Sequence, residues 1–150
     1  MGYKYVIFDL DGTIVDSQLG SCKGFQGALK AYGVEESLEN IKKLLGPPLS
    51  KTIITKYGFS EEDGKAAMKL HMNYLKTKGI YDAQYYDGMF EMLDKLKENG
   101  IKIAIATNKP EEISIKQLEH LKLKDYFDFI VGNNEEQTRG TKAEFIKMAM

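Results

Sequence analysis

Tyr5-Val6-Ile7-Phe8-Asp9-Leu10-Asp11-Gly12-Thr13 is the stretch from which both the fold and the chemistry can be predicted. Its first four residues form an unbroken β-branched and aromatic run, which is typical of a strand covered on both faces in a parallel sheet. Carboxylates two residues apart point to the same face of an extended chain, so Asp9 and Asp11 can converge on one reacting centre. Gly12 permits a sharp turn at the strand end.

Residues 16–79 carry only helical signals. Ser or Asp residues stand at several expected helix starts, and Gly or Gly-Pro stands at the stops. Within the first of these helices, Gly20, Gly24 and Gly27 each cost up to about 1 kcal/mol against Ala, which predicts close packing against another element. The expected helices run from Asp16 or Ser17 to Gly33, from Ser37 to Leu45, from Leu49 to Tyr57, and from Ser60 to Gly79.

Helices and strands alternate in the last part of the chain. This order predicts an α/β fold, a Rossmann-like parallel sheet core with an inserted helical cap. The core is expected to comprise residues 1–15 and 86–150, with the cap at 16–85, and its ligands to bind at the carboxyl ends of the strands. The expected elements are a helix from Asp87 to Gly100, a strand at 101–107, a helix from Pro110 to Leu121, a strand at 129–131, and a helix opened by the capping box of Thr141 and Glu144.

Composition excludes several classes of protein. The chain has 150 residues, 43% hydrophobic and 29% charged, which describes a globular protein. Its 21 Lys and Arg against 22 Asp and Glu argue against general nucleic-acid binding. Cys22 is the only cysteine, and neither a secretion signal nor an apolar stretch of about 20 residues is evident. We expect a cytoplasmic protein with no membrane segment.

Metal-loop and histidine alternatives are weaker than a catalytic carboxylate pair. A calcium loop counted from Asp9 requires Gly at its sixth position and Glu at its twelfth, where this chain has Ile14 and Gly20. The two histidines, His71 and His120, have no partner at metal-ligand spacing and are interpreted as structural. The bland alternative is a pair of carboxylates in a solvated turn.

The segment from Val6 to Thr13, with Val15-Asp16-Ser17, resembles the first motif of the haloacid dehalogenase (HAD) superfamily, in the branch with a helical cap inserted after it. Further segments look like those of phosphoglycolate phosphatase-like members, which are often grouped with 5'-nucleotidase-like phosphatases. These segments are Gly46-Pro47-Pro48-Leu49, Tyr86-Asp87-Gly88, Ala106-Thr107-Asn108-Lys109-Pro110, and Thr138-Arg139 followed by Lys142-Ala143-Glu144.

The resemblance implies a catalytic role for four residues. Asp9 would be the nucleophile that forms an aspartyl-phosphate, and Asp11 the general acid and base. Thr107 would bind the phosphoryl group, and Lys142 would neutralise its charge. Asp9 and Asp11 would also hold Mg²⁺. The implied substrate-binding residues are Gly12, Thr13 and Asn108 in the core and Lys51 in the cap.

Local signals support two of these roles independently. Thr107 and Asn108 precede a helix whose N-terminal amide groups would face an anion, although a plain N-cap is the competing reading. Lys142 stands in a first helical turn, the unfavourable end of the helix dipole for a cation, so a compensating anion is expected. Arg139, Lys109 and Lys51 are lesser candidates, each interpreted as a solvated surface charge.

One departure from the family concerns its fourth motif, an acidic pair after a further strand, which these 150 residues do not contain. Family topology places that strand against the first one, so we expect an open apolar strand edge, self-association through it, and weakened Mg²⁺ binding. Three alternatives follow: the chain is a shortened form of a longer enzyme, it is a frame-interrupted product, or it recruits a second copy to cover the edge.

The expected function is that of a Mg²⁺-dependent phosphatase acting on a small phosphomonoester, a phosphorylated metabolite. A sugar phosphomutase is the first alternative, because an aspartyl-phosphate can pass its phosphoryl group to a sugar. The Asp-Gly-Thr sequence at residues 11–13 makes it the weaker reading. A catalytically impaired binding remnant is the second alternative, and it would bind anions without turnover.

Overall fold

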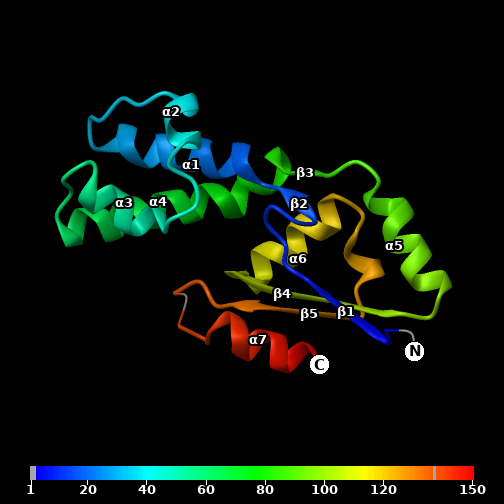
Figure 1. Cartoon of the computed structure of the whole chain (residues 1–150). Helices are drawn as coiled ribbons and strands as arrows, with labels where there is room; N and C mark the ends of the chain where they lie inside the picture. Colours follow the sequence, from blue (N-terminus) through cyan, green and yellow to red (C-terminus); the bar gives the residue numbers. More distant parts are fainter. Residues whose placement is uncertain (1–2, 137) are drawn as a thin grey trace. The chain divides into compact units, whose positions relative to one another are not determined.

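A computed structural model of the chain describes residues 3–136 and 138–150, and it divides into two compact units. One unit comprises Met1–Asp16 and Ala83–Met150, and the other Ser17–Asp82 (Figure 1). The predicted division placed residues 16–85 in the helical part. The structure assigns Asp16 and residues 83–85 to the α/β unit, because β2 (Val15–Asp16) and β3 (Gln84–Tyr85) pair as a short antiparallel sheet. No helix in the described residues is long and apolar enough to cross a membrane.

A three-stranded parallel sheet forms the centre of the α/β unit, in the order β1-β4-β5. Its strands are β1 (Tyr5–Phe8), β4 (Lys102–Pro110) and β5 (Phe129–Asn133). The predicted parallel α/β core is confirmed. The strand predicted at 101–107 extends to Pro110, with a register shift between Ala106 and Pro110. Among these three strands β1 lies at an edge, as expected.

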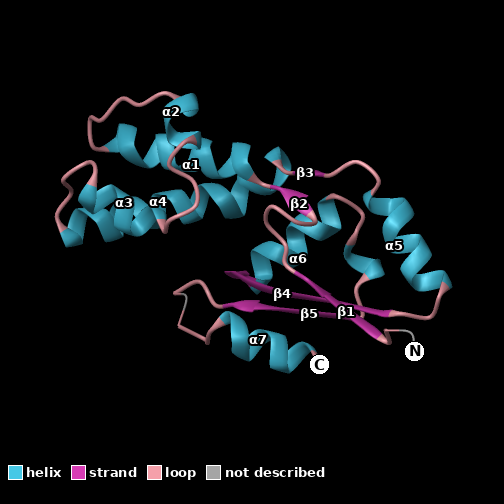
Figure 2. Ribbon diagram, in the orientation of Figure 1, coloured by secondary structure: helices cyan, strands magenta, loops and turns pink. Residues whose placement is uncertain are grey.

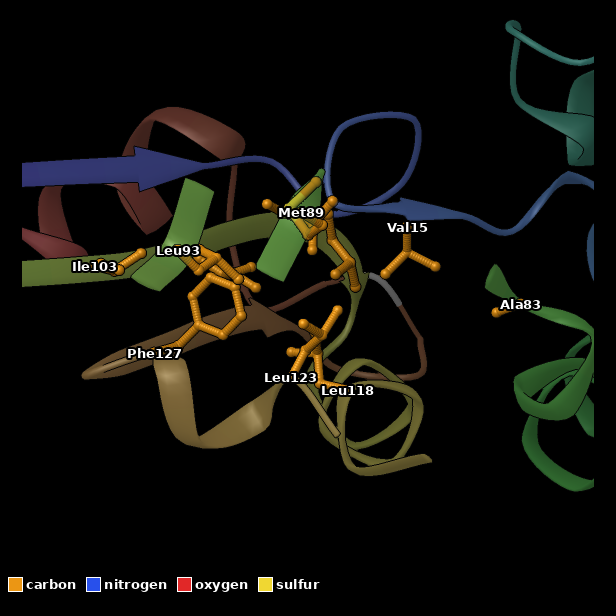
Figure 3. Packing of buried hydrophobic residues seen from close by; sticks show 11 residues of the cluster. Val15, Ala83, Met89, Leu93, Ile103, Leu118, Leu123 and Phe127 are labelled. Atoms are coloured by element: carbon orange, nitrogen blue, oxygen red, sulfur yellow. The ribbon is translucent and has the colours of Figure 1, made fainter. Parts of the chain in front are cut away.

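Helices cover both faces of this sheet (Figure 2). On one face, Ile103 and Ile105 of β4 join a buried cluster with Leu93 of α5 (Met89–Glu98) and Leu118 of α6 (Glu111–His120). Figure 3 shows Leu93, Phe127, Leu118 and Leu123 gathered beside β4; Leu123 and Phe127 flank the short helix η2 (Lys124–Tyr126). On the other face, Ala106 and Val131 pack with Phe145 of α7 (Lys142–Ala149). The alternation of side chains along β4 explains the two clusters.

The start of α5 differs from the prediction. Gly88, in the left-handed conformation with φ 76°, is its N-cap, and no side chain caps it. The expected cap from Asp87 is therefore wrong. In contrast, α7 of the same unit begins with a complete capping box of Thr141 and Glu144, as predicted.

The second unit consists of helices, as predicted for residues 16–79, except that Asp16 belongs to the strand β2. As N-caps, Ser37 and Ser60 accept hydrogen bonds from the backbone N–H groups of Asn40 and Asp63, whereas the Ser17 side chain forms no capping hydrogen bond. The helical spacing of apolar residues in the first helix predicts that Leu19 and Tyr32 lie on its buried face, but both are exposed. The elements are α1 (Gln18–Ala31), α2 (Leu38–Lys42), α3 (Leu49–Thr55), α4 (Glu61–Thr77) and η1 (Gly79–Asp82).

Close packing explains two of the three glycines inside α1. A Cβ on Gly20 would lie 2.7 Å from the Gly79 carbonyl oxygen, and one on Gly24 would lie 2.9 Å from His71 Nδ1. The prediction is wrong for Gly27, where a Cβ would meet nothing within 4 Å. Gly20 and Gly24 thus let α1 approach η1 and α4 more closely than any other residue would.

Gly20→Ala should lower the free energy of unfolding, because the new methyl group would meet backbone rather than a flexible side chain. We expect a loss of about 1–2 kcal/mol in urea titrations, the size of a typical overpacking penalty. Gly27→Ala is the matched control on the same helix and should raise stability by up to about 1 kcal/mol. Equal effects at the two positions would contradict close packing at Gly20.

Asp128 stabilises the amino-terminal end of the sheet. Its Oδ2 accepts a hydrogen bond from the Ile103 backbone N–H at 2.9 Å, and its carboxylate pairs with Lys102 at 3.1 Å and Lys97 at 3.2 Å. The backbone bond is the largest cause that lowers the pKa of Asp128, to about 2, with the two lysines adding to it. The ionised carboxylate thus favours the folded state.

Acid should remove this contribution in a defined window. Because the folded pKa lies below the unfolded value of about 3.9, the stabilisation is complete above pH 4 and is lost as pH falls towards 2. Since solvent screens this partly exposed carboxylate, Asp128→Asn should cost about 1 kcal/mol at pH 7. Urea unfolding from pH 7 to pH 2 should show the difference from wild type vanish, while Asp125→Asn should show no such convergence. A constant difference across this range would contradict the assignment.

Candidate active site

A tight loop follows β1 and presents the two predicted carboxylates. The Leu10 carbonyl accepts hydrogen bonds from the N–H groups of Thr13, Ile14 and Val15 at 3.2, 2.9 and 3.1 Å, and the Gly12 N–H donates to the Val15 carbonyl at 2.8 Å. Leu10, Ile14 and Val15 are fully buried, so they fix the loop to the core. Gly12 has φ +77°, a conformation that favours glycine, as the sequence predicted.

Asp9 meets a lysine from the far end of the chain. Lys142 Nζ lies 2.6 Å from Asp9 Oδ1, and the Leu10 backbone N–H donates to the same oxygen at 2.8 Å. The Asp9 side chain is 48% exposed, so a solute can reach the carboxylate. Lys142 is the first residue of α7, and Asp9 is the anion that its unfavourable place in the helix dipole led us to expect.

Asp11 contacts a second lysine, Lys109, which was only a lesser candidate from the sequence. Lys109 Nζ lies 2.9 Å from Asp11 Oδ1 and 2.8 Å from Gln117 Oε1. Only 10% of the Lys109 side chain is exposed, so its interpretation as a solvated surface charge is wrong. Its neighbours in the sequence carried no sign of this burial. Lys109 lies in the interval between Ala106 and Pro110 over which β4 changes register against β5.

Thr107 lies within β4 rather than at its end. It is 2% exposed, and its Oγ1 accepts a hydrogen bond from the Lys109 backbone N–H at 3.1 Å. Asn108 is exposed beside it. The helix that follows, α6, has Pro110 as its N-cap, so Thr107 and Asn108 are not the cap of that helix. Thr107 instead fixes the connection that carries Lys109.

Arg139 is exposed, as its interpretation as a surface charge predicts, and it also makes specific contacts. Its Nη1 lies 2.6 Å from Glu111 Oε2 and donates to the Gly132 carbonyl at 3.2 Å. Glu111 Oε2 in turn accepts from the Gly132 N–H at 3.1 Å. Arg139 therefore links the loop after β5 to Glu111 in the first turn of α6, and the backbone of Gly132 binds both side chains.

The same loop leads directly into Lys142. Asn133, which is 6% exposed, accepts hydrogen bonds at its Oδ1 from the N–H groups of Asn134 and Arg139, both at 3.0 Å. Thr141 N–H and hydroxyl donate to Glu144, and the backbone bond is the largest cause that lowers the pKa of Glu144. These bonds fix where α7 begins and hence where Lys142 is placed.

Of the predicted site residues, Asp9, Asp11 and Lys142 lie in two short ion pairs, and Thr107 joins them through Lys109. Gly12 and Thr13 are exposed in the loop after β1. Lys51 is exposed on α3, in the helical unit. His71 and His120 lie on α4 and at the end of α6.

The acidic side chains of the site are the candidate ligands for a metal ion. No group of three or more His, Cys, Asp and Glu side chains in residues 3–136 and 138–150 is arranged to hold a metal ion. Mg²⁺, however, is commonly held by one or two carboxylates together with water and a substrate phosphate. Asp9 and Asp11 provide oxygen ligands of the required kind. The pair therefore fits the smallest set of protein ligands with which Mg²⁺ is commonly held.

Known proteins resemble this chain in both sequence and fold. A family model described as haloacid dehalogenase-like hydrolase matches residues 6–150. The chain belongs to this family. A predicted phosphatase from Clostridium acetobutylicum has a similar structure, with a TM-score of 0.86, 38% identity, and coverage of 100% of this chain and 70% of that one.

Three curated relatives are named for different activities. A 5'-nucleotidase from Pseudomonas aeruginosa is 31% identical over 97% of this chain and 66% of its own length. A phosphoglycolate phosphatase from Aquifex aeolicus is 34% identical, covering 87% and 61% respectively. The tyrosine-protein kinase PtkA from Mycobacterium tuberculosis is 30% identical, covering 98% and 50%. The chain thus spans about half to two thirds of the length of these relatives.

Lys142→Met should weaken the binding of inorganic phosphate in magnesium-containing buffer by about tenfold or more, since hydrogen bonds to charged groups contribute about 1.5–3 kcal/mol. Isothermal titration calorimetry measures the effect. Lys147→Met, on the exposed surface of the same helix, is the matched control and should bind phosphate as wild type does. Equal affinity in the two variants would show that Lys142 does not face the anion.

Proposed function

We propose that the protein is a Mg²⁺-dependent phosphatase that hydrolyses a small phosphomonoester through an aspartyl-phosphate on Asp9. The observation that carries the proposal is the 2.6 Å contact between Lys142 Nζ and Asp9 Oδ1. An anionic carboxylate attacks an anionic phosphate only when nearby cations neutralise the charge between them. Lys142 supplies such a cation at the attacking group itself.

In the first step of the proposed reaction, an Asp9 carboxylate oxygen bonds to phosphorus while the bond from phosphorus to the leaving-group oxygen breaks. Asp11 gives its proton to that oxygen, and an alcohol departs. In the second step, a water oxygen bonds to phosphorus, the bond to Asp9 breaks, and Asp11 takes the proton of the water. Asp9 and Asp11 lie on one loop, which buried residues hold to the core.

Asp9 and Asp11 would hold Mg²⁺ in this proposal, and the ion when bound would neutralise phosphoryl charge. Thr107 and Asn108 of β4 would contact the phosphoryl group, together with Gly12 and Thr13 of the loop after β1. The proposed role of Lys51 is to contact an anionic group of the substrate from the helical unit.

A small phosphomonoester is the proposed substrate class because two of the relatives carry the names 5'-nucleotidase and phosphoglycolate phosphatase. A second candidate is transfer of the phosphoryl group to a hydroxyl acceptor other than water. Similarity to PtkA over 98% of this chain favours it, and the sugar phosphomutase reading belongs to the same class. Both candidates share the attack by Asp9 and differ only in the acceptor of the second step.

Turnover of an aryl phosphate with and without Mg²⁺ tests the proposal, in the 150-residue chain and in a form extended past residue 150. Extension should raise the rate about 100-fold or more, if it supplies further metal carboxylates, because lost transition-state electrostatics commonly cost this much. Asp9→Asn should abolish turnover, while Asp125→Asn should leave it unchanged, since Asp125 precedes β5 at the opposite end of the sheet.

Mg²⁺-independent turnover, or undiminished turnover in Asp9→Asn, would refute the phosphatase proposal. Adding an alcohol or sugar acceptor separates the two candidates, because a transferase forms a phosphorylated acceptor where a phosphatase forms inorganic phosphate. Anion binding without turnover in both forms would instead support the impaired binding remnant. Light scattering on the same samples tests the proposed self-association through the β1 edge.

A further inference from the structure

Lys109 has no role in the proposed reaction so far, and its burial is costly. Only 10% of its side chain is exposed, whereas 40% of the Asp11 side chain is exposed. Withdrawing an ammonium group from water is unfavourable unless charged or polar partners replace its hydration. Its contacts supply that replacement, and they lead from the interior of the α/β unit to Asp11.

Three hydrogen bonds fix Lys109. Its backbone N–H donates to Thr107 Oγ1 at 3.1 Å, and its Nζ donates to Asp11 Oδ1 at 2.9 Å and to Gln117 Oε1 at 2.8 Å. The residue is therefore held at both ends of its side chain. An ammonium group so constrained fixes the carboxylate oxygen that it contacts.

Gln117 is the buried support of this arrangement. It lies on α6 and is 2% exposed, although most residues at such positions in a helix are apolar. A leucine would fill a similar volume without desolvating an amide. The Gln117 carbonyl oxygen is a neutral acceptor, so it directs the Lys109 ammonium group without competing with Asp11 for its charge.

The backbone aims Lys109 at this point. β4 changes register between Ala106 and Pro110, and irregularities of this kind commonly redirect a side chain next to an active site. A Cβ on Gly132 would lie 2.6 Å from the Lys109 carbonyl oxygen and 2.9 Å from Glu111 Cα. Gly132 thus allows β5 to approach the segment closely enough to support its path.

From these contacts we propose that Lys109 is a positioning residue that holds the Asp11 carboxylate for proton transfer, and that Gln117 seats Lys109. The proposal rests on the proposed function, in which Asp11 exchanges a proton with the leaving group and then with water. An exposed aspartate on a loop samples several rotamers, and a fixed ammonium group at one of its oxygens selects one of them.

Steady-state kinetics of Gln117→Leu and Lys109→Met test this role, measured in the form extended past residue 150. Because neither residue contacts substrate in the proposed reaction, kcat should fall about tenfold to 100-fold while KM stays within about twofold, the range found when supporting residues of a site are removed. Lys109→Arg keeps the cation, so it should restore most of kcat, whereas Gln117→Glu introduces a carboxylate that competes with Asp11 for the ammonium group and should not restore it. Lys116→Met, on the exposed face of α6, is the control and should behave as wild type.

The outcomes distinguish a positioning role of Lys109 from direct substrate binding and from a purely structural role. A rise in KM at constant kcat would show that Lys109 binds substrate directly, and unchanged kinetics would show that the cluster is only structural; either result overturns the positioning role. Thermal unfolding checks that the variants fold, and the comparison of Lys109→Met with Lys109→Arg decides the question if Gln117→Leu does not fold. Absence of turnover in the wild-type protein would overturn the proposed function and this role together, whereas an active wild type with indifferent variants would overturn this role alone.

Discussion

Two lysines must reach two aspartates at the end of β1, and much of the α/β unit is arranged to bring them there. Lys142 Nζ lies 2.6 Å from Asp9 Oδ1, and Lys109 Nζ lies 2.9 Å from Asp11 Oδ1. Parallel strands direct their carboxyl ends to one edge of a sheet, so the residues after β1, β4 and β5 meet although they are far apart in the sequence. Neither carboxylate is isolated, because each has a cation from a different element.

Hydrogen bonds of the loops determine how accurately the lysines are placed. Asn133 binds the backbone of the loop after β5, and Arg139 joins that loop to Glu111 on α6. The capping box of Thr141 then sets the first turn of α7, where Lys142 begins the helix. Because these contacts lie next to the site, substitutions here should disturb the placement of Lys142 before they disturb the sheet.

Local signals made part of this arrangement predictable from the sequence. The apolar run of β1 and the capping box before Lys142 depend on neighbouring residues, and the structure has both as predicted. The buried position of Lys109 depends on a register shift and on Gln117 and Asp11, which are distant in the sequence, so composition alone suggested a solvated charge. Likewise β2 and β3 have two residues each and carry no periodicity, so only their pairing defines them.

The central claim is that Asp9 accepts a phosphoryl group. Mass spectrometry of the protein quenched in acid during turnover of an aryl phosphate tests it most directly. We expect one phosphoryl group on the peptide that contains Asp9. It should be lost at alkaline pH, as acyl phosphates are, and be absent from Asp9→Asn. A phosphoryl group on another residue, or turnover with no phosphorylated protein at any quench time, would contradict it.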